Sequence, residues 1–111
     1  MTDGIDLSVR QREIVRDVLR PLADCIDEVR VFGSRAMGTA RPASDIDLAV
    51  IGDIDQPCLD RLWTAFDQSA LAVTVDIANY RAMAGSPLKR HIDAVGITLF
   101  DREGLLQREA R

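Results

Sequence analysis

Hydrophobic residues in the first part of this chain recur at the spacing of a helix. From Ser8 to Ile26 they fall at three- and four-residue intervals, which predicts an amphipathic helix with one face toward a core. Ser8 and Gln11 have the form of a capping box at its start. Pro21 predicts a kink or a break, because proline lacks a backbone donor and crowds the preceding turn. We expect this helix to cover one face of a sheet.

Shorter segments have the strand pattern and predict that sheet: 28–32, 45–51, 71–78 and 97–100. In the second segment, Asp45 and Asp47 alternate with apolar residues and so fall on the face opposite to them. In the third segment, Asp76 also lies opposite the apolar face. Each of these two strands should therefore turn one face to the core and the face with the acids away from it.

Two further helices follow from the pattern. One begins near Pro57 and carries an apolar stripe in which we expect Trp63 to be a core residue rather than a base-stacking platform. The other begins after Ser86 and ends before Gly96. Its apolar stripe includes His91, the only histidine, which predicts a place at the edge of the core rather than a ligand or general base.

The connecting segments complete the expected fold. Gly33 and Ser34 predict a turn into a short helix, and residues 39–44 predict a loop because they include a proline. Residues 101–111 are charged and are predicted to be a tail that is frayed or bound to a partner. We expect a single domain over residues 1–111, an α/β (α+β) fold of two layers. It should have a mixed sheet of about four strands, helices on one face and the acids exposed on the other.

Composition and charge argue against some classes of function but do not identify the function itself. The 111 residues carry a formal net charge of −4, and the basic residues are scattered, so we expect no binding to long nucleic acids. The N-terminus lacks the pattern of a signal peptide and no apolar run could span a bilayer, which predicts a cytoplasmic protein without membrane contact. Cys25 and Cys58 do not form a metal-binding pair, and we expect them to be reduced thiols in or near the core.

The acids indicate a metal-dependent reaction at phosphorus. Asp45 and Asp47 are two apart in a predicted strand, so their carboxylates should project on one side about 7 Å apart. With Asp76 they would form a group of like charges, which is costly unless cations lie among them. Mg²⁺ suits such hard oxygen ligands, and two ions can hold the attacking and leaving oxygens of an in-line displacement. Backbone N–H groups after Gly33 could meet a phosphate. This pattern favours phosphoryl or nucleotidyl transfer.

Two rival motifs fail at one or two required positions. Residues 33–40 begin like a P-loop, but Thr39 and Ala40 occupy the positions of its lysine and hydroxyl residue. A calcium-binding loop would need a third oxygen ligand where Ala49 stands. Neither motif explains the acids.

Taken together, the motifs resemble a known family. Gly33-Ser34, then after a gap Asp45-Ile46-Asp47 and a separate Asp76, are similar to the signature of the polymerase-β-like nucleotidyltransferase superfamily. More narrowly, residues 32–38 (FGSRAMG) and 44–48 (SDIDL) resemble the minimal nucleotidyltransferases. Many of those are encoded beside a HEPN-domain protein and act as its antitoxin. The resemblance extends from the first helix to the last strand.

The resemblance implies a role for each motif residue. Gly33 and Ser34 would hold the β- and γ-phosphates of a nucleoside triphosphate, and Asp45 and Asp47 would bind the two Mg²⁺ ions. Asp76 would complete the metal site and help to remove the proton from the acceptor hydroxyl. All three aspartates would thus be catalytic and metal-binding residues.

Arg35 flanks this motif and is a further candidate for nucleotide binding, although an arginine that is merely exposed to solvent is the commoner explanation.

The resemblance also implies a reaction and a partner. ATP would be the donor, and AMP would be transferred to a tyrosine of a HEPN-type RNase toxin, with which the chain would form a hetero-oligomer. Modification would neutralise the toxin. Two alternatives stay open: an antitoxin that binds its HEPN partner stoichiometrically without catalysis, and a nucleotidyltransferase that modifies a small molecule.

Overall fold

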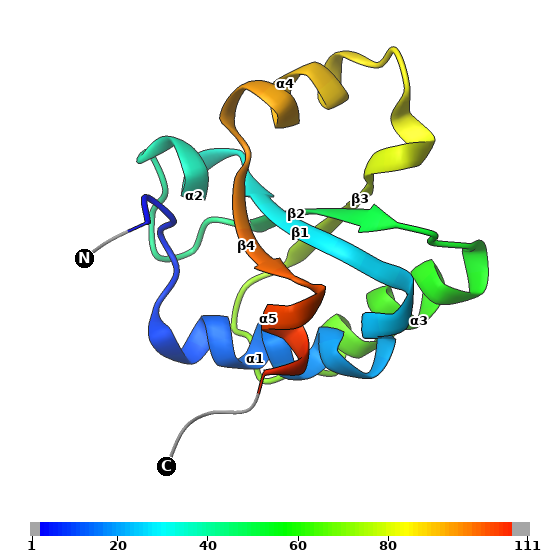
Figure 1. The fold of residues 1–111 in the computed structure, drawn as a ribbon. Coiled ribbons are helices and arrows are strands. Elements are labelled where there is room, and N and C mark those ends of the chain that lie inside the picture. The colour runs from blue at the N-terminus through cyan, green and yellow to red at the C-terminus, as the bar shows by residue number, and fades with distance from the viewer. Residues whose placement is uncertain (1–2, 108–111) are drawn as a thin grey trace.

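The computed structural model describes residues 3–107 and shows a four-stranded sheet between two sets of helices (Figure 1). In chain order the elements are α1 (Val9–Leu19), the 3-10 helix η1 (Arg20–Cys25), β1 (Ile26–Phe32), α2 (Ser34–Met37), β2 (Ile46–Gly52), α3 (Gln56–Asp67), β3 (Val75–Asn79), the 3-10 helix η2 (Tyr80–Met83), α4 (Pro87–Val95), β4 (Ile97–Asp101) and α5 (Arg102–Leu106).

The sheet is mixed, as the sequence predicted. Its strand order is β3-β2-β1-β4, with β1 antiparallel to both β2 and β4 and with β2 parallel to β3. Parallel neighbours need a crossover connection, and α3 supplies it between β2 and β3. The parallel pair therefore has both of its strands starting at the same end of the sheet.

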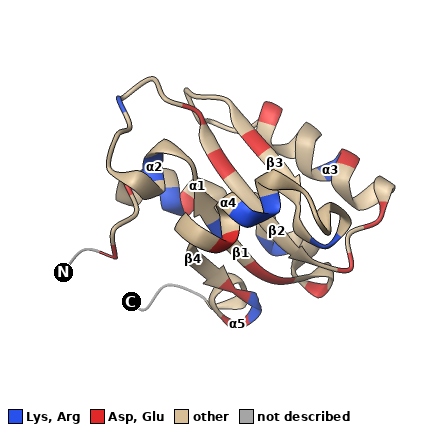
Figure 2. Cartoon of the chain, turned by 90° about the horizontal axis from the view of Figure 1, so that it is seen from above, with Lys and Arg blue, Asp and Glu red and all other residues tan. Residues whose placement is uncertain are grey.

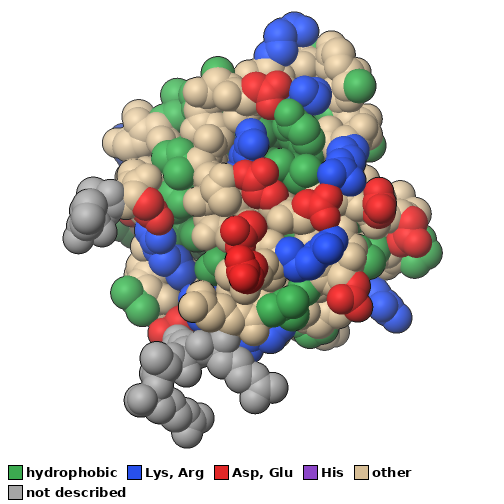
Figure 3. Space-filling model, viewed as in Figure 1, with side chains coloured by type: hydrophobic (Ala, Val, Ile, Leu, Met, Phe, Trp, Pro, Cys, Tyr) green, Lys and Arg blue, Asp and Glu red, His purple; other side chains and the backbone are tan. Residues whose placement is uncertain are grey.

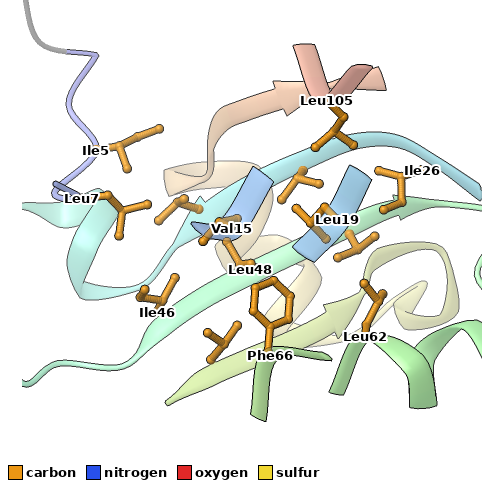
Figure 4. Close-up of a cluster of buried hydrophobic side chains, with 14 of the residues drawn as sticks. Ile5, Leu7, Val15, Leu19, Ile26, Ile46, Leu48, Leu62, Phe66 and Leu105 are labelled. Atoms are coloured by element: carbon orange, nitrogen blue, oxygen red, sulfur yellow. The ribbon is translucent and has the colours of Figure 1, made fainter. Parts of the chain in front are cut away.

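The larger core lies between the sheet and the layer formed by α1, α3 and α5. Figure 4 shows side chains of α1, β2 and α3 meeting there, among them Leu19, Leu48 and Phe66. Ile46, Leu48 and Val50 are fully buried, so the predicted apolar face of β2 is the core face. Burial of this apolar face holds the two layers together.

A smaller core on the opposite face corrects the prediction that helices cover one face only. Ile92 of α4 is fully buried and packs with Phe32, Ala49 and Ala78. The alanines present little bulk on β2 and β3, which leaves room for a helix to approach the sheet. The face that carries the acids is therefore partly covered by α4.

Two predicted boundaries shift by four residues or more, and several strand ends shift by one or two. The capping box of α1 forms, with Ser8 accepting from the Gln11 amide, but α1 ends at Leu19 and a 3-10 helix containing Pro21 continues to Cys25. The expected break is thus confirmed and a single helix to Ile26 is wrong. The third strand begins at Val75 rather than at residue 71, because it pairs with β2, which itself begins only at Ile46.

The predicted tail is a structured element up to residue 107. Asp101 caps α5 by accepting a hydrogen bond from the Gly104 amide at 2.7 Å, and Leu105 is fully buried in the core. Arg20 donates from Nε to the Leu105 carbonyl at 3.0 Å. The expectation of a frayed segment is therefore wrong for residues 101–107, and its remaining part lies outside the described residues.

The helices otherwise differ from expectation at one aromatic residue. Leu62 and Phe66 of α3 are buried, but Trp63 is 40% exposed, so it lies at the flank of the apolar stripe and not in the core.

Among the helices of residues 3–107, none combines the length and the apolar character needed to cross a bilayer.

Charged side chains of both signs are interspersed on the face seen in Figure 3. Arg30 pairs with Glu28 at 2.8 Å, and Asp27 pairs with both Arg81 and Arg102 at 2.7 Å. These ion pairs neutralise basic groups locally. On the face in Figure 3, acidic side chains interrupt the basic ones, so that face forms no continuous basic surface for a phosphate backbone.

Candidate functional site

The residues singled out in the sequence meet at one end of the sheet. Asp47 is the second residue of β2, Asp76 is the second residue of β3, and the two are partners in the parallel register. On its other side Asp47 is the register partner of Phe32, the last residue of β1, after which Gly33 begins the turn. In Figure 2, acidic positions lie on the neighbouring strands β2 and β3, near α2 and α4. The strand phase predicted this proximity.

Glycine is the only residue type that fits at position 33, between β1 and α2. Its φ of +68° and ψ of −152° belong to a region essentially restricted to glycine. A Cβ atom at this position would lie 2.2 Å from Oδ2 of Asp47. The turn backbone and the Asp47 carboxylate are therefore in close contact.

Asp47 is the carboxyl group of this site whose pKa is raised. Burial raises its pKa, and the nearby carboxylates of Asp76 and Asp45 raise it further, whereas His91 acts in the opposite direction. Asp45 and Asp76 are exposed and Asp47 is half-buried, so solvent reaches the group. A bound cation would relieve the repulsion among these carboxylates.

These carboxylates fit a magnesium ion that is bound by the protein together with waters and substrate phosphates, and not by protein groups alone. Within residues 3–107, no three side chains of the types His, Cys, Asp or Glu gather closely enough to hold a metal ion by themselves. Mg²⁺ is usually bound through one or two carboxylates together with waters and substrate phosphates. Asp47 and Asp76, with Asp45 nearby, offer oxygens of that kind.

Ser34 begins α2, the short helix that follows the turn. The amides of Ala36 and Met37 both donate to the Gly33 carbonyl at 3.1 Å. The N–H groups of Ser34 and Arg35 precede these first helical bonds and have no acceptor within the helix. The turn thus presents backbone donors beside the acids.

Arg35 does not occupy the position that the sequence suggested. It is only 3% exposed, and its guanidinium donates to the carbonyls of Asp6, Pro42 and Ser44. These contacts hold the loop between α2 and β2. The structure gives Arg35 this role in the framework of the loop.

His91 lies at the edge of the smaller core, as predicted, and also beside the acids. Its ring meets the ring of Phe32 edge-on, with centroids 6.1 Å apart and planes at 80°. Because Phe32 is the register partner of Asp47, α4 brings the histidine close to the carboxylates. No sequence pattern indicated this proximity, since the contact joins segments far apart in the chain.

Comparison with known proteins places the chain in a family. Residues 16–104 match the family described as "Polymerase beta, Nucleotidyltransferase". The chain is 31% identical over 112 aligned positions to "Probable protein adenylyltransferase MntA" of Haemophilus influenzae, covering 97% of this chain and 96% of that protein. The chain therefore belongs to the polymerase β nucleotidyltransferase family, and MntA is its homologue.

Solved structures show the same fold. One, described as a toxin–antitoxin with AMP-PNP, superposes with a TM-score of 0.67 at 25% identity, covering 86% of this chain and 80% of the other. A second, a mutant of the toxin–antitoxin MntA-HpeT, gives a TM-score of 0.66 at 23% identity over the same shares of the two chains. The mixed sheet with its helices is thus the nucleotidyltransferase fold that the sequence predicted.

Proposed function

We propose that this chain is an antitoxin that transfers AMP from ATP to a tyrosine of a HEPN-type RNase toxin and thereby neutralises it. The observation that carries the proposal is the pairing of Asp47 with Asp76 beside the glycine turn. The homologue named as a protein adenylyltransferase and the related toxin–antitoxin structure with AMP-PNP support the choice of reaction and of partner class.

Asp45, Asp47 and Asp76 are the residues that would hold Mg²⁺. The ions would neutralise charge on the triphosphate and polarise the phosphorus under attack. Asp76 is exposed on β3, next to the edge of the site, and can accept the proton of the incoming tyrosine hydroxyl. Its neighbour Asp47 is less exposed and is suited to a ligand role.

Gly33 and Ser34 would bind the triphosphate through the turn. Without a Cβ at Gly33 the backbone can approach both the phosphates and the Asp47 carboxylate. The N–H groups at the start of α2 and the Ser34 hydroxyl supply donors to phosphate oxygens. Pyrophosphate would leave from this side while AMP passes to the acceptor.

A direct test is transfer of label from ATP to the partner. The purified chain is mixed with labelled ATP, Mg²⁺ and the cognate HEPN protein, and the partner is then analysed for label and for the modified residue. We expect label on a tyrosine of the partner. Asp45→Asn and Asp47→Asn should each abolish transfer, while Asp60→Asn, a change at an exposed acid on α3, should leave it unchanged.

The same experiment separates the alternatives. If the partner is neutralised at equal molar amounts by Asp47→Asn without any label, the chain acts by stoichiometric binding. If label appears on added small molecules and not on the partner, the acceptor is a small molecule. Transfer that survives both aspartate substitutions would show that the site is placed wrongly.

A further inference from the structure

Arg35 forms a buried polar centre that the proposed reaction does not use directly. Its Nε and Nη2 donate to the Ser44 carbonyl at 3.3 and 2.8 Å. Nη2 also donates to the Pro42 carbonyl at 3.3 Å, and Nη1 donates to the Asp6 carbonyl at 2.9 Å. A buried charge is tolerated only when its hydrogen bonds are made, and here main-chain oxygens make them.

We propose that Arg35 is a positioning residue that sets the place of Asp45 in the metal site. Ser44, whose carbonyl Arg35 holds twice, directly precedes Asp45 in the chain. Asp45 lies just outside β2, which begins at Ile46, so the strand ladder alone does not fix it. The guanidinium supplies the missing constraint. This inference rests on the proposed function, because Asp45 is a metal ligand only if the chain binds Mg²⁺ and ATP as proposed.

The loop end is closed by bonds that Arg35 supports. The Ser44 amide donates to the Arg41 carbonyl at 3.0 Å, and the Arg41 amide donates to Oγ of Ser44 at 2.8 Å. The Ile46 amide then donates to the Thr74 carbonyl at 2.9 Å, where the parallel pairing with β3 begins. Asp45 is thus held between a clamped turn on one side and the sheet on the other.

The N-terminal segment completes the clamp from the opposite side. The Asp6 amide donates to the Arg35 carbonyl at 2.8 Å, while the Asp6 carbonyl accepts from the guanidinium. Ile5 and Leu7, on either side of Asp6, are buried in the larger core. The segment before α1 is therefore anchored, and it transmits that anchoring to the site through Arg35.

Lysine cannot replace this geometry. The planar guanidinium reaches three carbonyls from one side chain, whereas an ammonium group is a compact point charge without the fork. Residues that orient metal ligands without touching the metal typically change metal affinity by about 10- to 100-fold when they are altered. Arg35→Lys should therefore weaken the binding of ATP with Mg²⁺ even though the charge is kept.

Arg102 offers a matched control at the other end of β1. Its Nε donates to the carbonyls of Ala23 and Ile26, and its Nη2 donates to the carbonyl of Asp24. Arg102→Lys removes arginine bonds to three main-chain carbonyls and the bond from Nη2 to Asp27, at a more exposed position away from the site. Two readouts are compared on the full-length chain: amide hydrogen exchange without nucleotide, and calorimetric titration with ATP and Mg²⁺.

We expect Arg35→Lys to speed exchange of the Arg41, Ser44 and Ile46 amides by about tenfold or more, because local opening there becomes easier. It should also weaken ATP binding by roughly 10- to 100-fold in the presence of Mg²⁺. Arg102→Lys should change neither quantity by more than about twofold, since distant substitutions act independently. Unchanged exchange and unchanged ATP affinity in Arg35→Lys would overturn the proposal.

Failure of the function and failure of the inference give different results. A wild-type chain that does not bind ATP with Mg²⁺ refutes the proposed function, and the exchange experiment still judges the clamp on Asp45. If Arg35→Lys does not fold, Arg35→Gln replaces it, because a single side-chain amide can keep only part of the bonds to the Asp6, Pro42 and Ser44 carbonyls. Arg35→Gln should then speed exchange at the Ser44 and Ile46 amides and weaken ATP binding in the presence of Mg²⁺; wild-type values for both would overturn the proposal.

Discussion

Asp47 and Asp76 are register partners on parallel strands, so their carboxylates project from the same face of the sheet. Burial raises the pKa of Asp47 first, and the charge of Asp76 adds to this effect. The native chain therefore carries an unfavourable interaction at its own site, which a cation would convert into a favourable one.

Replacement of one partner should expose this interaction. A carboxyl group with a raised pKa in the folded state stabilises the protein below its ordinary pKa, and that contribution is lost as the pH rises through the raised value. Asp76→Asn should therefore unfold less easily than wild type at pH 7, by about 1 kcal/mol or less, and the difference should shrink toward pH 3. Urea unfolding without Mg²⁺ at the two pH values measures it, with Asp60→Asn as the control. A variant that is less stable than wild type at pH 7 and equal at pH 3 would contradict the expectation.

Gly33→Ala should damage the site beyond the cost of backbone strain. The new Cβ would displace the Asp47 carboxylate, because the two would be 2.2 Å apart. Gly85→Ala is the matched control: its φ is +77° and nothing lies within 4 Å of the added atom. Both should lose roughly 1–3 kcal/mol of stability, because both have a positive φ that alanine adopts only under strain. Only Gly33→Ala should also weaken ATP binding. We expect a loss of about tenfold or more, which corresponds to at least about 1.4 kcal/mol of binding free energy. Equal ATP affinities in the two variants would argue against the contact.

The N-terminal segment should loosen in acid. Arg12 holds Asp3 through two hydrogen bonds of 2.7 and 3.0 Å, and this contact lowers the pKa of Asp3 to about 2. A lowered pKa stabilises the fold above the ordinary value, and that contribution is lost as the pH falls toward 2. Because Asp3 is largely in contact with solvent, Asp3→Asn should cost only up to about 1 kcal/mol at pH 7 and almost nothing near pH 2. Urea unfolding curves at the two pH values test this, and an equal cost at both would contradict it.

Cys58 should resist alkylation in the folded chain. Burial, followed by a hydrogen bond with Cys25, raises the pKa of its thiol to about 11. Since the thiolate is the nucleophile, only about one molecule in a thousand is reactive at pH 8. In the Cys25→Ser variant, which leaves Cys58 as the single thiol, labelling by iodoacetamide should be about 100-fold slower than in urea or more. Mass spectrometry over time measures the rates, and equal rates would show that the thiol is accessible.

Leu105→Ala should destabilise the protein strongly although it lies close to the end of the chain. The side chain is fully buried in the larger core, and a leucine-to-alanine change in such a place costs about 2–5 kcal/mol. Leu106→Ala is the control, because that side chain is 53% exposed and should change stability by no more than about 0.5 kcal/mol. Thermal and urea unfolding of both variants would decide, and similar stabilities would mean that α5 contributes little to the core.

The alternation of residues in β2 and β3 was enough to predict the core face and to bring Asp47 and Asp76 together, because side-chain direction in a strand follows directly from position. The start of β3 could not be predicted in this way. Leu71 and Val73 continue the alternation and pack against the core, but a strand needs a partner, and β2 offers none before Ile46.

Other features had no signature in the sequence. Leu105 stands in a segment too short for a helical period to be visible, so its burial follows only from the shape of the core. The position of α4 depends on the small volume of Ala49 and Ala78, which strand alternation does not weigh. The role of Arg35 depends on carbonyl oxygens, which every residue carries, and no pattern of side chains could reveal which of them an arginine would find.

The loop between α2 and β2 is anchored unevenly, and this bears on how the family can vary. Arg35 grips its second half at Pro42 and Ser44, whereas residues 37–39 are exposed. Residues added near Thr39 would bulge into solvent and leave Asp45 where it is, while an insertion after Ser44 would displace it. The number of residues between the two motifs can therefore change near Thr39 without displacing Asp45. A motif search that requires a fixed gap would miss a relative that has such an insertion and an intact site.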